Sequence, residues 1–512
     1  MIELRRILIA LMLATVASTA FAQDHPGRGG GERANHPDQG QQGGAPQQNG
    51  PGVLSLLPGD SVTEHTIDLS TGKLAYTATA GTLSLFDQSG QRSAAIFYTA
   101  YVAKTDNAAA RPVTFVFNGG PGAASAFLNL GLVGPRVAQF GMDGHDGANV
   151  HLGDNPDTWL AFTDLVLIDP VGTGWSRAAK PDGSSAFWSV HSDAESMAKV
   201  IALYVAKNNR ASSAKFILGE SYGGFRAAKV ARQVQDSQGI VISGILMASP
   251  LLEGAFQFGG DRFALGAALQ LPSLAAAELE RKGTFSKDAL AQAEHFALTD
   301  YLSTLAGPPL RGDAAKTFYA RVAQVTGLSP DVVAEGRGFI RDEYIKNLRS
   351  GDHKIVSHYD ATFASDDPYP ESPSPRGPDP ILDGVVRAYG GAFVAYARDE
   401  LGFKTDMTYN LLAEDVTSKW DWGGSGHSQP SAADDLRVLL ALTPSFHLMV
   451  AHGYSDMVTP YAVTRYLLDH LPPLEGEERA QLKLYRGGHM FYLDPESRKA
   501  FTADARTMYA AR

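Results

Sequence analysis

Cysteine is absent from the 512 residues of this chain. Disulfides and a lipid anchor attached through cysteine are therefore excluded, and core packing alone must stabilise the fold. Charge is sparse and unbalanced, with 44 basic against 55 acidic residues and a net charge of −11. An acidic surface argues against nucleic acid and anionic membranes as partners. Long apolar runs are also missing, because no stretch approaches the roughly eighteen residues that a membrane span requires.

The N-terminus has the three parts of a signal peptide: a basic pair, a short apolar run, and small residues before a cleavage point. These parts are Arg5-Arg6, Ile7–Ala17 and Ala20-Phe21-Ala22. We expect residues 1–22 to be removed near Ala22, which predicts a periplasmic or secreted protein with no membrane span in its mature form.

Residues 23–52 are rich in glycine, glutamine, proline and asparagine and have almost no apolar side chains. Such a segment cannot offset the entropy cost of ordering, so we predict a disordered linker. Its histidines, His25 and His36, could bind a metal weakly, but a solvated tail is the favoured interpretation.

The most informative stretch is Phe216–Leu218 followed by Gly219-Glu220-Ser221-Tyr222-Gly223. A short apolar run that ends in Gly-x-Ser-x-Gly before a segment able to form a helix is typical of a nucleophile elbow. There a tight strand-to-helix turn exposes the serine hydroxyl, and the helix N-terminus favours developing negative charge. With 53 glycines in the chain, the motif alone is a weak signal, so its partners matter.

Those partners, an acid and then a histidine, should follow the serine in α/β-hydrolase order. Asp456 lies in the loop after a strand-like run, Phe446–Gly453, and His489 follows a second run, Gln481–Tyr485. We therefore predict that His489 is the base for Ser221 and that Asp456 orients its imidazole. The rival histidines His447, His452 and His470 lack a glycine turn directly after a strand.

The remaining pattern predicts an α/β fold. Short runs over residues 62–105 suggest antiparallel strands, with turns at Gly72 and Asp87–Gly90. The predicted parallel strands are Val113–Phe117, Leu165–Ile168, Phe216–Leu218, Ile240–Met247, His447–Val450 and Gln481–Tyr485. Residues 250–445 interrupt them with helical periodicity, as in Leu274–Arg281, Lys287–Ala297, Ala314–Val325 and Leu382–Leu401. The proline-rich stretch at 366–380 is expected to be an exposed loop; a protein-binding proline motif is the alternative.

Two further motifs accompany these: Asn118-Gly119-Gly120-Pro121-Gly122 after a strand, and Asp169-Pro170-Val171-Gly172-Thr173-Gly174. Together with Gly-Glu-Ser-Tyr-Gly-Gly, the Asp456 loop and Gly-His-Met, the chain from about 95 to 505 resembles the serine carboxypeptidases (peptidase family S10). The resemblance implies an exported, bacterial-type member with an α/β-hydrolase fold: a mostly parallel central sheet with a large helical cap insertion. The expected division is a core of residues 53–249 and 446–512 with a cap of 250–445.

The resemblance also implies a function: a serine-type carboxypeptidase that releases C-terminal residues through an acyl-enzyme on Ser221, with no cofactor or metal. The oxyanion donors would be the backbone N–H groups of Gly120 and Tyr222. Asn118 and Glu220 match positions that hydrogen-bond the substrate's terminal carboxylate, and Gly119 is assigned to the same subsite. The expected partner is a peptide or a small acyl substrate.

One departure from the family pattern weakens the carboxypeptidase assignment. Family members have a second glutamate that pairs with the one beside the serine, and this position falls on Leu132, in register with Gly134-Pro135. A shared proton between two carboxyls helps to bind a carboxylate at acidic pH, so half of this clamp is missing. An esterase or acyltransferase with the same triad therefore remains open, as does a binding protein on an inactive hydrolase scaffold.

Overall fold

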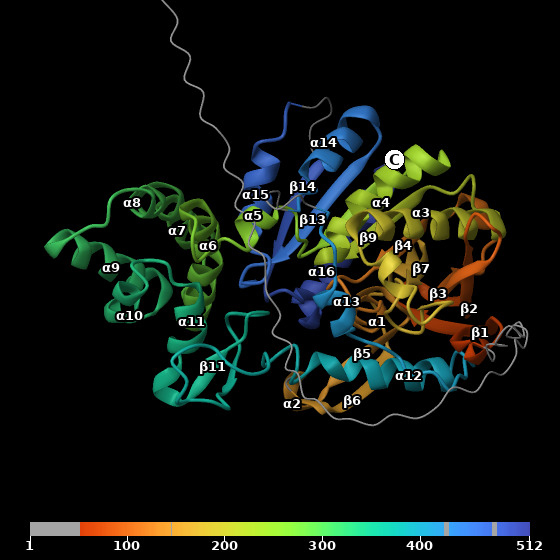
Figure 1. Ribbon diagram of the computed structural model, residues 1–512, viewed down its shortest axis with the longest axis horizontal. Helices are drawn as coiled ribbons and strands as arrows, with labels where there is room; N and C mark the ends of the chain where they lie inside the picture. Colours follow the sequence, from red (N-terminus) through yellow and green to blue (C-terminus); the bar gives the residue numbers. More distant parts are fainter. Residues whose placement is uncertain (1–51, 145, 424–429, 474–478, 512) are drawn as a thin grey trace, which may run out of the picture. The chain divides into compact units, whose positions relative to one another are not determined.

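The computed structural model describes residues 52–144, 146–423, 430–473 and 479–511 (Figure 1). The predicted signal peptide, and the predicted linker except for Gly52, lie outside the described residues. A sheet of 10 strands dominates the rest, in the order β1-β2-β3-β7-β4-β9-β10-β13-β14, with β8 beside β3.

The first three strands form the antiparallel part of the sheet, as the sequence predicted. They are β1 (Ser61–Leu69), β2 (Gly72–Phe86) and β3 (Arg92–Ala103). Gly72 has a φ of 119° and makes the first tight turn, which a residue with a side chain would enter only under strain. Along β2 buried and partly exposed side chains largely alternate, as in a strand with one face on the core.

Six parallel strands then carry the centre of the sheet: β4 (Val113–Phe117), β7 (Asp164–Ile168), β9 (Lys215–Glu220), β10 (Gly244–Ala248), β13 (His447–Gly453) and β14 (Ala480–Tyr485). The prediction that a strand begins at Ile240 is wrong. Residues 240–243 link the helix that ends at Gln238 to the strand that starts at Gly244, and β-branched side chains there mimicked a longer strand.

Helices cover both faces of this sheet, which explains the continuous apolar runs of its strands. On β9, Ile217 packs in one hydrophobic cluster with α3 (Val190–Lys207), α4 (Tyr222–Gln238) and α14 (Ala433–Leu442). Its neighbours Phe216 and Leu218 pack in a second cluster with α1 (Ala126–Leu128), α12 (Tyr389–Asp399) and α16 (Pro495–Ala510). This is the predicted α/β-hydrolase arrangement, and the carboxyl ends of its parallel strands share one edge.

Between β10 and β13 the chain is mostly helical. The helices grouped in green in Figure 1 are α6 (Ala264–Arg281), α7 (Lys287–Phe296), α8 (Leu302–Ala306), α9 (Gly312–Thr326), α10 (Pro330–Glu335) and α11 (Arg341–Asn347). They share a hydrophobic cluster of their own, which also includes Met457 from the loop after β13.

Shorter elements complete the description. These are α2 (Gly141–Gly144), α5 (Gly254–Gln257), α13 (Glu414–Ser418), α15 (Tyr461–Asp469), β8 (Arg177–Ala178) and the hairpins β5 (Arg136–Phe140) with β6 (Asp146–Asp154) and β11 (Lys354–Val356) with β12 (Ala364–Asp366). Of the predicted loop 366–380, Asp366 is the last residue of β12, and residues 367–380 form neither helix nor strand. None of the helices within the described ranges has the length and apolar character needed to cross a membrane.

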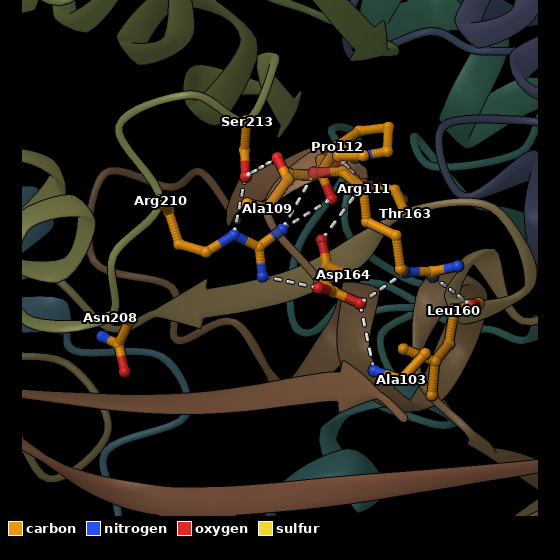
Figure 2. A network of polar contacts seen from close by, with 12 residues as sticks. Ala103, Ala109, Arg111, Pro112, Leu160, Thr163, Asp164, Asn208, Arg210 and Ser213 are labelled. Carbon is orange, nitrogen blue, oxygen red and sulfur yellow. Dashed lines mark hydrogen bonds and ion pairs between the residues drawn. The ribbon is translucent and has the colours of Figure 1, made fainter. Parts of the chain in front are cut away.

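A buried ionic network fixes the amino ends of the central strands (Figure 2). Asp164, the first residue of β7, accepts hydrogen bonds from Arg111 Nε at 2.9 Å and Arg210 Nη1 at 2.6 Å. Arg210 also donates to the carbonyl of Arg111 at 3.0 Å and to the Ser213 hydroxyl at 2.8 Å. Because these buried charges are paired and hydrogen-bonded, the segments before β4, β7 and β9 are held together without an orphaned charge.

Candidate active site

Ser221 lies at a sharp turn between β9 and α4. Strand β9 ends at Glu220, α4 begins at Tyr222, and Ser221 between them has φ 57° and ψ −126°. A residue with a side chain adopts such a conformation only when its surroundings enforce it, and here the strand before it and the helix after it do so. Ser221 is only partly buried, whereas the residues on either side are buried.

The glycines around Ser221 are there because the turn leaves no room for side chains. A Cβ on Gly219 would overlap the carbonyl of Gly223, and one on Gly223 would lie 2.5 Å from the carbonyl oxygen of Phe117. A Cβ on Gly224 would lie 2.5 Å from Pro250 Cβ. The turn itself thus requires Gly219, the end of β4 requires Gly223, and Pro250 after β10 requires Gly224.

The structure brings Asp456 and His489 together. His489 Nδ1 lies 2.9 Å from Asp456 Oδ2, and both side chains are buried. Asp456 Oδ1 accepts the backbone N–H groups of Val458 at 2.8 Å and Thr459 at 3.0 Å, and the Thr459 hydroxyl donates to Oδ2 at 2.7 Å. This set of donors fixes the carboxylate, which in turn fixes the imidazole.

Burial lowers the pKa of the His489 imidazole, but the charge and hydrogen bond of Asp456, together with the charges of Glu220 and Asp379, raise it by more. The net pKa lies above the ordinary histidine value. The rival His452 has a different environment, because its Nε2 meets the Thr464 hydroxyl at 2.8 Å and burial lowers its pKa to about 4. His447 begins β13 and so lies at the far end of that strand from Asp456, and His470 is exposed beside Tyr466.

The Asn118–Gly120 turn lies directly against the serine turn. A Cβ on Gly119 would come within 2.6 Å of both the Glu220 carbonyl oxygen and the Tyr222 nitrogen, so only glycine fits there. Gly120 has a φ of 100°, in the range that favours glycine. The backbones that carry the predicted oxyanion donors, Gly120 and Tyr222, are therefore neighbours.

Asn118 and Glu220 also meet, through their side chains. Asn118 Nδ2 donates to Glu220 Oε2, while Asn118 Oδ1 accepts the N–H of Leu128 at 3.0 Å. On its other oxygen, Glu220 accepts the Tyr492 hydroxyl at 2.7 Å. Burial raises the pKa of Glu220, whereas His489, Tyr492 and Asn118 act in the opposite direction, and the net pKa lies above the ordinary value.

Leu132 is fully buried in the π-helical turn Asn129–Val133 and belongs to the hydrophobic cluster on its face of the sheet. Its carbonyl accepts Asn155 Nδ2 at 2.8 Å. The position where the resemblance led us to expect an acid therefore lies in an apolar core.

A buried ion pair supports Asn118 from behind. Arg226 on α4 pairs with Asp193 on α3 at 2.7 Å, and its Nη1 donates to the Asn118 carbonyl at 2.5 Å. The guanidinium also stacks over the Tyr222 ring, 4.9 Å from its centroid. Arg226 thus connects the nucleophile helix to the turn that carries Gly119 and Gly120.

The insertion reaches both catalytic loops through residues 358–361. The N–H of His489 donates to the Tyr359 carbonyl at 2.5 Å, and the N–H of Met457 donates to the His358 carbonyl at 3.2 Å. The Ser455 hydroxyl donates to Asp360 Oδ1 at 2.7 Å. One short segment of the insertion therefore contacts the loops on both sides of the acid–histidine pair.

Sequence reasoning did not identify Tyr492, Tyr359 or Arg226. Tyr492 lies three residues after His489 and Arg226 lies on the helix that follows Ser221, so their closeness to named motifs was an available signal. Tyr359 had no such signal, because it comes from the middle of a helical insertion.

The chain is similar to known serine carboxypeptidases. The family model for serine carboxypeptidases matches residues 73–267. The pheromone-processing carboxypeptidase KEX1 of Yarrowia lipolytica is 27% identical over 152 residues, which cover 29% of this chain and 23% of that protein. The match thus spans about a quarter of the relative's length.

A solved structure is also similar. The prohormone-processing carboxypeptidase Kex1 of Saccharomyces cerevisiae superposes with a TM-score of 0.52 and 15% identity, covering 85% of this chain and 91% of that one. At this identity the likeness shows the fold.

Proposed function

Since this chain belongs to the serine carboxypeptidase family, we propose that it is a serine-type carboxypeptidase that releases C-terminal residues from peptides. The observation that carries the proposal is the hydrogen bond between His489 Nδ1 and Asp456 Oδ2 at 2.9 Å, on loops that follow strands of the same parallel sheet as the Ser221 turn. An oriented imidazole and a serine on a strained turn are what nucleophilic acyl transfer requires.

In the proposed reaction the Ser221 hydroxyl attacks the scissile carbonyl carbon and its proton passes to His489 Nε2. The imidazolium is stabilised by Asp456, and its proton then goes to the leaving nitrogen as the C–N bond breaks. Water attacks the acyl-enzyme, His489 removes the proton of the water, and Ser221 leaves with that proton restored. Because the pKa of His489 is raised, the base is active only above a correspondingly higher pH.

The tetrahedral oxyanion would be bound by the backbone N–H groups of Gly120 and Tyr222. The close approach of Gly119 to the Tyr222 nitrogen supports this assignment, because it brings the two backbones side by side. Donors fixed by backbone geometry require no reorganisation when charge develops in the transition state.

Asn118, Gly119 and Glu220 are the proposed subsite for the terminal carboxylate of the substrate. A protonated Glu220 would donate to that carboxylate, and burial, which raises the pKa of Glu220, favours this protonated form. The proposed substrates are peptides or small acyl compounds.

An esterase or acyltransferase activity of the same triad is the second candidate. It is favoured by the burial of Leu132 in the apolar core at the position of the second acid. A C-terminally blocked peptide separates the two candidates, because a carboxypeptidase of this kind depends on the free terminus and an esterase does not.

We propose two further features of this protein. The mature protein is exported to the periplasm or beyond, on the basis of residues 1–22. Residues 250–445 act as a cap on the catalytic core; the separate hydrophobic cluster of α6–α11 and the contacts of residues 358–361 with the catalytic loops support this.

The test is Ser221→Ala together with labelling by a fluorophosphonate. We expect kcat for peptide hydrolysis to fall by roughly 10⁴–10⁶-fold in the variant, with its thermal unfolding unchanged. The probe should label the unmodified protein at Ser221, as located by peptide mass spectrometry. A purified variant that keeps a tenth or more of the activity would rule out Ser221 as the nucleophile.

A further inference from the structure

Tyr492 is hydrogen-bonded to the carboxyl oxygen of Glu220 that Asn118 does not contact. Its side chain is fully buried in the short turn Phe491–Leu493, just after His489, and its hydroxyl donates to Glu220 Oε1 at 2.7 Å. Asn118 donates to Oε2, so each carboxyl oxygen already accepts one hydrogen bond.

The chain makes room for Tyr492 in the turn that contains Leu132. A Cβ on Gly131 would lie 2.7 Å from Tyr492 Cε2 and 2.7 Å from the hydroxyl of Tyr389, so only glycine fits beside these rings. Leu132, the next residue, lies in the same hydrophobic cluster as both tyrosines. The turn that would supply a second acid instead packs against the aromatic partner of Glu220.

We propose that Tyr492 is the second member of the terminal-recognition pair, and that it sets the pH above which the site stops preferring free C-terminal acids and accepts neutral ends such as amides. The inference rests on the proposed function. Tyr492 acts here through Glu220 and is a positioning residue.

A carboxyl and a phenol have different effects on the protonation of Glu220 when they are its hydrogen-bond partner. Two adjacent carboxyls share a proton, which keeps one of them neutral and able to donate to a substrate carboxylate. A phenol adds no negative charge at ordinary pH and its hydrogen bond stabilises the ionised form of Glu220. Burial and the adjacent Glu220 raise the pKa of Tyr492 well above its usual value, so this donor is permanent.

Ionisation of Glu220 then decides which end of a peptide fits. An ionised Glu220 repels a terminal carboxylate and offers an acceptor to the N–H of a terminal amide. A protonated Glu220 donates to the carboxylate. Free-acid selectivity should therefore fall as the pH rises through the pKa of Glu220, at a lower pH than without the phenol.

Several other titratable groups face Glu220. His489 lowers its pKa and Asp456 raises it, while Tyr359 from the insertion and Tyr389 from α12 lie within electrostatic reach. His489 and Asp456 serve both substrates in the proposed reaction. Their titration largely cancels in the ratio of kcat/KM for an acid to kcat/KM for its amide.

The experiment measures that ratio for an N-acyl dipeptide and its C-terminal amide between pH 4.5 and 8. The proteins compared are the unmodified enzyme, Tyr492→Phe and Glu220→Gln. Tyr485→Phe is the matched control, because its hydroxyl donates to the Asp504 carboxylate at the same 2.7 Å but away from the site. We expect the midpoint of the ratio to move up by about one pH unit in Tyr492→Phe and to stay in place in Tyr485→Phe.

Glu220→Gln should make the ratio of the two kcat/KM values independent of pH. This measurement tests the inference even if Tyr492→Phe does not fold. An unchanged midpoint in a folded Tyr492→Phe, or a ratio that still titrates in Glu220→Gln, would overturn the inference while leaving the carboxypeptidase intact. If hydrolysis did not depend on Ser221, the proposed function would be wrong, and this inference would be wrong as well.

Discussion

Tyr359 and His489 are joined twice. The carbonyl of Tyr359 accepts the His489 N–H at 2.5 Å, and the two rings lie edge to face with centroids 5.2 Å apart. Since Tyr359 belongs to the insertion, the helical segment between β10 and β13 helps to position the imidazole. Displacing Tyr359 should therefore disturb catalysis although Tyr359 contacts no reacting atom except through His489.

Gly488→Ala tests this contact. Its Cβ would overlap the Tyr359 carbonyl and lie 2.6 Å from Asp360 Cα, so backbone must move. We expect kcat to fall by about 10²-fold, because a small misplacement of a catalytic group is costly. Gly391→Ala in α12 is the control, since its Cβ would meet no atom within 4 Å and should leave kcat unchanged. Equal kcat in the two variants would contradict the role given to Tyr359.

Asp456→Asn should lower kcat by roughly 10³–10⁴-fold near neutral pH. Two backbone N–H groups point at Oδ1, so the new amide will turn its oxygen to them and its nitrogen to His489. That nitrogen favours the wrong imidazole tautomer. Steady-state kinetics should show little effect of Asp469→Asn, an exposed acid at the end of α15. The reverse result would mean that Asp469 is the acid of the triad.

Arg226→Met should destabilise the protein by about 3–5 kcal/mol, because it leaves the buried Asp193 without its partner. Denaturant unfolding measures this loss. Adding Asp193→Leu should recover most of the stability but not the activity, since the Asn118 carbonyl still lacks its donor. Full recovery of kcat in the double variant would show that Arg226 has no role at the turn.

Asp169 should make the stability depend on pH. Burial raises the pKa of this carboxyl from 3.8 to about 6, although Ser125 donates its N–H to it at 2.7 Å. A raised folded-state pKa penalises the ionised form, so stability is highest below about pH 4 and falls as the pH rises to about 6. From this group alone the loss is about 3 kcal/mol. The difference in unfolding free energy between the protein and Asp169→Asn should change by about 2.4 kcal/mol between pH 4 and pH 7, because the unfolded carboxyl is already partly ionised at pH 4. A constant difference would contradict the shift.

Strand ends could be predicted from sequence because each is a local pattern. An apolar run followed by a glycine turn indicated where Ser221, Asp456 and His489 would lie, and the common edge of parallel strands implied that they would meet. The prediction of a strand over Ile240–Met247 was wrong at its start for the same reason. Its β-branched residues have the local pattern of a strand whether or not a neighbouring strand pairs with residue 240.

The partners of Glu220 and His489 could not be predicted in this way. Tyr492 reaches Glu220 across 272 positions of sequence, and nothing in Phe491-Tyr492-Leu493 distinguishes a hydrogen-bonding tyrosine from one packed in a core. Tyr359 contacts His489 with its backbone carbonyl, a group that every residue carries. Only the folded structure of the insertion determines that the carbonyl of Tyr359 is the one that contacts His489.

The ionic network around Asp164 lies at the opposite edge of the sheet from the catalytic residues. Arg111 and Arg210 fasten the starts of β4, β7 and β9 to this carboxylate, so strand alignment is decided at one edge of the sheet. Ser221 lies beyond the opposite edge. Segments on the Ser221 side of the sheet can therefore be lengthened or exchanged without changing the alignment of the strands. A design for a new specificity would replace α6–α11 and keep Asp164, Arg111 and Arg210 unchanged.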